Sequence, residues 1–129
     1  MTKNPKDVVI TSALRTPIGK YKGKLSNYQS FDLGKIVIKK ILKDSDISPD
    51  LIDEVIIGQV LTGETGQNPA RQAAIKAGIP VDKTAYLINQ VCGSGLRSIV
   101  AGYQSILLED AKIVTVSYTH LTLPTILLV

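Results

Sequence analysis

Cys92, the single cysteine of the chain, is the residue best suited to chemistry, and it stands in the stretch YLINQVCGSGLRS at residues 86–98. An apolar run precedes it, and Gly93-Ser94-Gly95 follows it. This pattern predicts a strand that turns sharply at the glycines into a helix. A helix start carries unpaired N–H groups and the positive end of the macrodipole, where negative charge is favoured. Because thiolate is the nucleophilic form of cysteine, Cys92 is a candidate nucleophile for acyl transfer.

Three other interpretations of this stretch compete with a nucleophile. Free cysteines often pack as small buried apolar residues, and the placement of Cys92 alone leaves that alternative open. A dinucleotide fingerprint G-x-G-x-x-G would require glycine at Ser98, so this motif is incomplete. A hydrolase elbow G-x-S-x-G would place glycines two residues from the serine, whereas those around Ser94 are its immediate neighbours.

The elements around Cys92 alternate along the chain. Strands are predicted at residues 8–10, 54–58 and 85–91 and from residue 113 onward, and helices at residues 30–44, 69–77 and 94–109. Ser30 is the expected cap of the first helix, and Ser48-Pro49 opens a short helical turn. The last helix carries an apolar stripe that includes Leu96, Tyr103 and Leu107. This order predicts an α/β protein with a mainly parallel sheet and covering helices.

Charge is distributed unevenly along the chain. Residues 1–43 carry ten basic and two acidic residues, and residues 44–129 carry five basic and nine acidic residues. A basic half raises the possibility of a nucleic-acid partner, but few aromatic residues accompany the lysines. The lysines between residues 35 and 43 recur at helical spacing opposite apolar residues, which is typical of a solvated helix face. We therefore expect no nucleic-acid partner.

Membrane insertion and disulfide bonding are excluded by simple counts. The apolar runs are shorter than the roughly 18 residues that a membrane span requires. One cysteine excludes an internal disulfide, and the first residues are polar, which together predict a cytoplasmic location. No metal site is expected.

Three stretches carry a resemblance to a known family. VVITSALRTPIGKYKGKLS, VIIGQVLTGETGQNPARQAAIKAGIP and NQVCGSGLRSI together resemble the thiolase family, above all its acetyl-CoA acetyltransferases, from about Val8 to Val114. The resemblance implies the truncated N-terminal half of a layered αβαβα fold, with Cys92 as the acyl-thioester nucleophile. It also implies condensation of two acetyl-CoA molecules to acetoacetyl-CoA, or the reverse thiolysis, in fatty acid metabolism. Coenzyme A thioesters would be substrates, with no cofactor, and the full-length protein would be a homodimer or homotetramer.

The chain departs from the family pattern in what it lacks. The activating histidine, the second cysteine and the oxyanion elements of thiolases would follow the last residue of this sequence, so the chain by itself is expected to be inactive. Two alternatives stay open: a β-ketoacyl synthase-like condensing enzyme, and a non-catalytic domain that binds acyl groups or a partner. Arg71 lies in a region that is near the dimer interface in thiolases, but an ordinary surface position on a helix explains it as well. The same holds for Arg97, which could pair with an acid or be solvated.

The last stretch of the chain has a different character. Residues 117–129, SYTHLTLPTILLV, contain no charged residue and no glycine. A back-translation of residues 116–125 resembles an adapter used in sequencing libraries. We therefore predict a partial thiolase N-terminal domain at residues 1–115 and a non-native tail at residues 116–129. His120, the only histidine, lies in that tail and is not expected to act as a base for Cys92.

Overall fold

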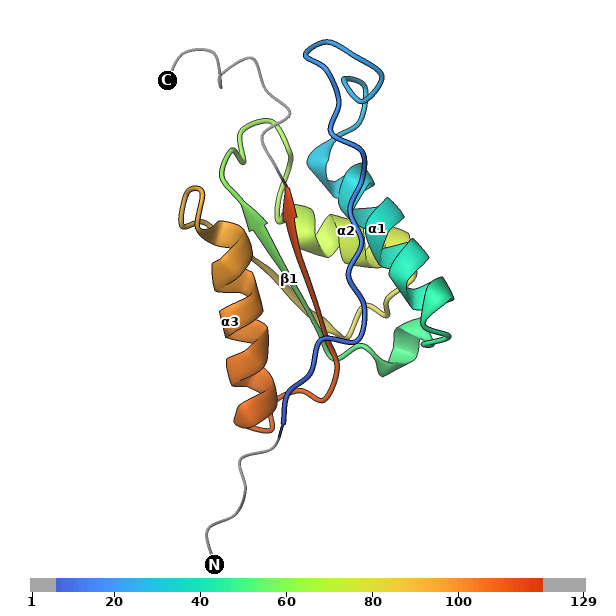
Figure 1. Cartoon of the computed structure of the whole chain (residues 1–129), viewed down its shortest axis with the longest axis vertical. Helices are drawn as coiled ribbons and strands as arrows, with labels where there is room; N and C mark the ends of the chain where they lie inside the picture. Colours follow the sequence, from blue (N-terminus) through green and yellow to red (C-terminus); the bar gives the residue numbers. More distant parts are fainter. Residues whose placement is uncertain (1–6, 120–129) are drawn as a thin grey trace, which may run out of the picture.

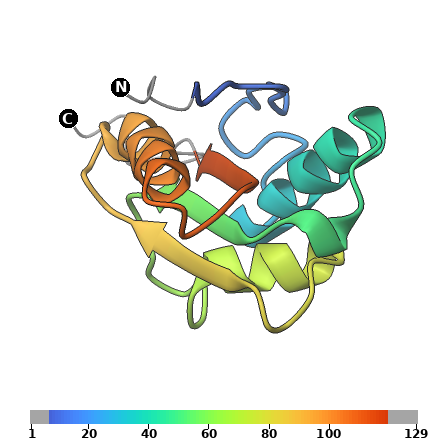
Figure 2. The same ribbon diagram turned by 90° about the horizontal axis from the view of Figure 1, so that it is seen from below.

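A parallel three-stranded sheet forms the centre of the protein in the computed structural model, which describes residues 7–119. The strands are β1 (Glu54–Gln59), β2 (Thr84–Ile88) and β3 (Val114–Thr119), in the order β2-β1-β3. The helices are α1 (Ser30–Asp44), α2 (Pro69–Ala77) and α3 (Ser94–Leu107), with a 3₁₀ turn η1 at Pro49–Leu51. Helices α1 and α2 lie on one face of the sheet and α3 on the other (Figures 1 and 2). The predicted α/β class and the parallel sheet are confirmed.

Successive residues of the central strand β1 serve opposite faces of the sheet. Val55 and Ile57 are buried in a cluster with residues of α1 and α2. This cluster also contains a group of alanines from α2, namely Ala70, Ala73, Ala74 and Ala77. Small residues let the two helices approach closely, since a Cβ placed on Gly34 of α1 would lie 3.2 Å from the Cβ of Ala73. Gly58, next along β1, faces the start of α3 instead.

Local capping chemistry explains the ends of α2. The Oδ1 atom of Asn68 accepts a hydrogen bond from the backbone N–H of Arg71 at 3.1 Å, and Pro69 occupies the first helical position. Gly78 ends the helix with φ +99°, a left-handed conformation that glycine adopts without steric cost. Helix α2 thus spans the residues 69–77 that the sequence predicted.

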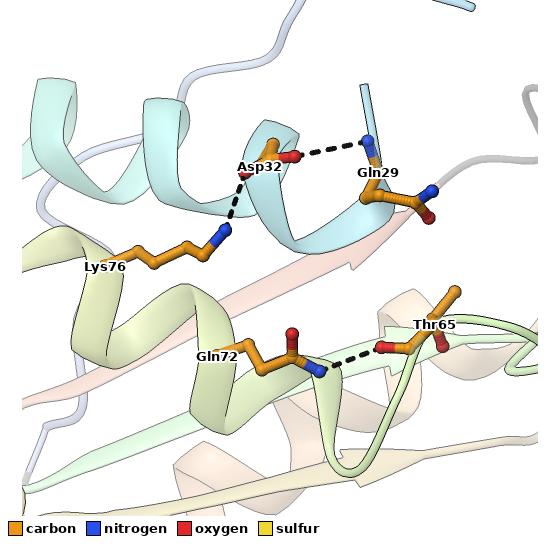
Figure 3. Close-up of polar contacts among 5 residues, drawn as sticks. All are labelled: Gln29, Asp32, Thr65, Gln72 and Lys76. Carbon is orange, nitrogen blue, oxygen red and sulfur yellow. Dashed lines mark hydrogen bonds and ion pairs between the residues drawn. The ribbon is translucent and has the colours of Figure 1, made fainter. Parts of the chain in front are cut away.

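Helix α1 spans the predicted residues 30–44, but its N-cap lies one residue earlier than predicted. Gln29, not Ser30, is the N-cap, and its backbone N–H donates to the carboxylate of Asp32 at 3.4 Å. The same carboxylate forms an ion pair with Lys76 of α2, whose Nζ lies 3.2 Å from the Asp32 Oδ1 (Figure 3). Asp32 therefore joins the first turn of α1 to the last turn of α2.

One predicted strand does not form, and two predicted boundaries differ from the structure. Residues 8–10 form no strand, and Val9 and Ile10 are exposed. A β-branched run favours an extended backbone, but it becomes a strand only where a neighbouring strand accepts its hydrogen bonds. The strand predicted at residues 85–91 ends at Ile88, because the residues before Cys92 form a turn, and α3 ends at Leu107 rather than at residue 109.

The side of α3 that contacts the sheet consists of small residues. Its buried residues are Ser94, Ser98 and Gly102. A Cβ on Gly102 would lie 3.1 Å from side-chain carbons of both Val114 and Val116, so the helix lies directly on β3. The apolar stripe of α3 consequently points away from the sheet, and Leu96 is 70% exposed.

The end of the described chain includes part of the predicted tail. Val116–Thr119 belong to β3 and pair in register with Ile56–Gln59 of β1. Residues 120–129, with His120, lie outside the described residues. The domain boundary proposed between residues 115 and 116 stays a prediction. None of the helices within residues 7–119 is both long enough and apolar enough to cross a membrane.

Asp53, just before β1, is expected to make the stability of the fold depend on pH. Its Oδ2 atom accepts the backbone N–H groups of Lys112 at 2.8 Å and of Ile113 at 3.2 Å, and Lys83 lies 3.7 Å from its Oδ1. The pKa of Asp53 lies below its ordinary value of 3.8, chiefly because the Lys112 N–H donates to the carboxylate. Partial burial raises the pKa. The Ile113 N–H and the positive charges of Lys83 and Lys112 lower it further. A depressed pKa stabilises the folded state above pH 3.8, and this contribution is lost as the pH falls toward the folded-state value.

We therefore expect Asp53→Asn to lower the free energy of unfolding at neutral pH by about 1–2 kcal/mol. The loss should shrink in urea titrations carried out from about pH 5 down to pH 3. Asp82→Asn, a change at an exposed carboxylate next to Lys83, is the matched control and should have little effect. An equal loss at all pH values would contradict this role of the Asp53 charge.

Candidate active site

Cys92 lies in the turn between β2 and α3, two residues before the first residue of the helix. The thiol is free and exposed, so Cys92 is not a core residue. The turn follows the carboxyl end of a parallel strand, which is where open α/β sheets commonly bind ligands. Cys92 is therefore accessible to a substrate from solvent.

The turn is closed by hydrogen bonds on both sides of Cys92. The backbone N–H of Gly93 donates to the Gln90 carbonyl at 3.0 Å. The Ser94 Oγ donates to the Val91 carbonyl at 2.6 Å and accepts from the Gln90 N–H at 2.8 Å. Val91 itself has φ +49°, a left-handed conformation that β-branched residues rarely adopt. The backbone is thus tightly bent immediately before Cys92.

Asn89 attaches this turn to the central strand. Its Oδ1 accepts from the Val91 N–H at 3.1 Å, and its Nδ2 donates to the carbonyl of Val60 at 3.0 Å. Val60 directly follows β1. Residues 89–91, which lead to Cys92, and Val60 after β1 are therefore held together at the carboxyl ends of β1 and β2.

Gly58 of β1 is a site residue that the sequence reasoning missed. A Cβ at this position would lie 2.6 Å from the carbonyl carbon and 2.7 Å from the carbonyl oxygen of Ser94. Only glycine allows the backbone at the start of α3 to lie so close to β1. The available signal was a glycine at the end of a predicted strand, since a strand glycine often marks a close approach of another backbone.

A side chain of α2 also holds the loop that follows β1. The Gln72 Nε2 donates to the backbone carbonyls of Thr65 at 2.8 Å and of Gln67 at 2.9 Å; the bond to Thr65 is drawn in Figure 3. Gly66, between the two carbonyls, has φ +72°. One side chain of α2 therefore sets the shape of residues 65–67.

Arg71 holds a backbone segment in place, and Arg97 lies on the surface. Arg71 Nη1 donates to the backbone carbonyls of Val81 at 3.2 Å and Lys83 at 2.6 Å, and so braces the segment that leads into β2. Arg97 is exposed on α3. Burial raises the pKa of the Tyr86 phenol and the Glu54 charge raises it further, whereas the charge of Arg97 lowers it. Neither arginine shows a contact with Cys92 among the described residues.

Two further features bear on what the site can hold. Within residues 7–119, no group of three or more His, Cys, Asp or Glu side chains is placed to hold a metal ion. A cavity of about 600 Å³ lies between the segment at residues 10–26, α1 and β3, with Leu14, Ile18, Leu33, Val37 and Val116 among its lining. Cys92 does not line it, so this cavity is separate from the candidate active site.

Sequence comparison identifies relatives over most of the chain. The family model described as "Thiolase, N-terminal domain" matches residues 8–117. The acetyl-CoA acetyltransferase of Paracoccus denitrificans is 51% identical over 106 residues, which cover 82% of this chain and 27% of the relative. A probable acetyl-CoA acetyltransferase of Escherichia coli is 49% identical over 109 residues, covering 84% of this chain and 28% of the relative. The chain thus spans just over a quarter of the length of these curated relatives.

Solved structures show the same local architecture. A thiolase of Ascaris suum in complex with coenzyme A superimposes with a TM-score of 0.72 and 38% identity, covering 74% of this chain and 25% of that one. Human mitochondrial 3-ketoacyl-CoA thiolase in complex with CoA gives a TM-score of 0.74 and 39% identity, covering 78% of this chain and 26% of that one. The described fold therefore matches part of these structures.

Proposed function

The chain belongs to the thiolase family, and we propose on this basis that it carries the nucleophile of an acetyl-CoA C-acetyltransferase. The observation that carries the proposal is the exposed Cys92 in a fixed turn at the start of α3. The Cys92 thiolate attacks the carbonyl carbon of acetyl-CoA, the thioester bond breaks, and coenzyme A leaves as its thiolate. A second acetyl-CoA, deprotonated at its methyl group, attacks the acetyl-cysteine. A carbon–carbon bond forms, Cys92 leaves as thiolate, and acetoacetyl-CoA is released.

The remaining catalytic groups are proposed to come from a longer protein. The part of the chain that the structure describes contains no histidine and no second cysteine, so it offers neither imidazole nor thiol as an acid or base. We propose that such groups lie in the three-quarters of the relatives that this chain does not match. The chain by itself should then be inactive, because co-acting catalytic groups lose most of their effect when separated.

Partners and location follow from the same proposal. Coenzyme A thioesters are the proposed substrates, and the two solved relatives described in complex with coenzyme A support this. β2 lies at one edge of the described sheet, and an unpaired edge readily pairs with another strand. We therefore propose a homodimer, or a tetramer of such dimers, for the longer protein. A cytoplasmic location is proposed because a single cysteine suits a reducing compartment.

A chimeric enzyme tests the proposed function directly. Residues 8–117 would replace the corresponding segment of the Paracoccus denitrificans acetyltransferase, with which this chain is 51% identical. We expect the chimera to cleave acetoacetyl-CoA with coenzyme A and to form an acetyl adduct on Cys92 detectable by mass spectrometry. The unaltered relative is the control for the assay. A folded chimera without adduct or thiolysis would contradict the proposal.

A further inference from the structure

We propose that Ser94 is a positioning residue whose buried hydroxyl holds Val91 in its left-handed conformation and so fixes the Cys92 thiol at the start of α3. The importance of this for acyl transfer rests on the proposed function. The geometric proposal itself concerns only the turn. It follows from the strain at Val91, the two hydrogen bonds of Ser94 and the lack of space around Ser94.

Val91 is in a conformation that its own side chain disfavours. Its φ is +49°, and left-handed backbone costs L-residues free energy, most of all those branched at Cβ. Val91 is 62% exposed, so little packing compensates for that cost. Such strain persists only where surrounding contacts determine the backbone.

Ser94 supplies contacts at both ends of the strained segment. Its hydroxyl accepts from the N–H of Gln90 at 2.8 Å and donates to the carbonyl of Val91 at 2.6 Å. One side chain therefore spans the two residues that precede Cys92. Because Ser94 is fully buried, losing its hydroxyl would remove the acceptor of the Gln90 N–H in a confined space. The Val91 carbonyl would lose its shorter hydrogen bond and keep the one from the Ser94 backbone N–H at 3.1 Å.

Ser94 also has a rigid support. The backbone of β1 at Gly58 lies so close that a Cβ there would approach the Ser94 Cβ to 2.9 Å. The position of the hydroxyl is thus set by the central strand of the sheet. Through Ser94, the sheet determines the conformation of Val91 and hence the direction of the Cys92 side chain.

Ser98, one turn further along α3, provides a matched control. It is also buried, at 1% exposed, and its hydroxyl donates to the Gly95 carbonyl at 2.7 Å and lies 3.3 Å from the Ser117 carbonyl. Removing this hydroxyl should cost stability similar to that lost at Ser94. Its contacts lead to the helix and β3, not to the residues before Cys92.

The test uses the 129-residue chain and two measurements on Ser94→Ala and Ser98→Ala. Alkylation of Cys92 by iodoacetamide reports the position of the thiol, expressed as the folded rate divided by the rate in urea. The intraresidue amide–Hα nuclear Overhauser effect of Val91 reports positive φ. We expect Ser94→Ala to reduce the alkylation ratio about 2- to 5-fold, since the sulfur loses its fixed place at the helix start. The strong Val91 effect should weaken as well, and Ser98→Ala should change neither quantity.

A rescue experiment separates positioning from general stability. Glycine adopts positive φ without strain, so Val91→Gly in the Ser94→Ala background should restore the alkylation ratio. If Ser94→Ala alone does not fold, a folded double variant supports the proposal and an unfolded one overturns it. The proposal is also overturned if Ser94→Ala matches Ser98→Ala in both measurements, or if glycine brings no rescue. None of these readouts requires acyl transfer, so an inactive chimera would count against the proposed function and leave this result intact.

Discussion

Replacement of Cys92 by serine is expected to abolish acyl transfer while leaving the fold unchanged. In the chimera with the Paracoccus denitrificans relative, the thiolysis rate should fall by about four to six orders of magnitude, as seen when an enzyme loses its nucleophile. The physical reason is that a serine hydroxyl is a far weaker nucleophile than a thiolate without a dedicated base. Because Cys92 is exposed, one substituted atom should alter packing very little.

The acetyl adduct makes this prediction specific. Mass spectrometry after incubation with acetyl-CoA should detect an acetylated peptide around residue 92 in the parent chimera and none in Cys92→Ser. Thermal unfolding of the two proteins should agree closely, which excludes a collapse of the fold as the cause. Near-normal thiolysis by the serine variant would show that Cys92 is not the nucleophile.

Substitution of Gly58 by alanine is expected to destabilise the fold more than any other glycine-to-alanine change near Cys92. The new Cβ would lie 2.6 Å from the Ser94 carbonyl carbon, and that atom is backbone, which has no rotamer through which to give way. We expect the free energy of unfolding to fall by about 2–3 kcal/mol. We also expect α3 to move away from β1, which would displace the turn that carries Cys92.

Gly63→Ala is the matched control for this change. No atom lies within 4 Å of a Cβ built at Gly63, so the same substitution there should be close to neutral in urea unfolding. In the chimera, Gly58→Ala should also reduce thiolysis at temperatures where the variant is fully folded, because the turn is displaced. Equal stability of the two alanine variants would contradict the close approach between β1 and Ser94.

Features that depend on neighbouring residues in the chain were predictable from the sequence. Helix α2 begins and ends where Asn68-Pro69 and Gly78 predict, because capping is satisfied within one turn of the helix. The corner at Cys92 was predicted at the right place, because an apolar strand followed by Gly93-Ser94-Gly95 marks a turn into a helix. The glycines do not bend it, however: Gly93 has a right-handed φ of −79°, and the left-handed residue of the turn is Val91. The parallel sheet followed from the alternation of apolar strands with helices.

Features that depend on residues distant in sequence were decided only by the tertiary structure. Residues 8–10 have the composition of a strand but form none in the described structure, because strand formation requires a partner that composition does not specify. The sequence shows an apolar stripe on α3 but not which face lies on the sheet; Ser94, Ser98 and Gly102 do, because β3 lies too close for larger side chains. The sequence by itself therefore determined that Cys92 stands at a turn into a helix. The shape of that turn, with Val91 left-handed and Ser94 against Gly58, arises from contacts between β1 and α3 that lie more than thirty residues apart in the chain.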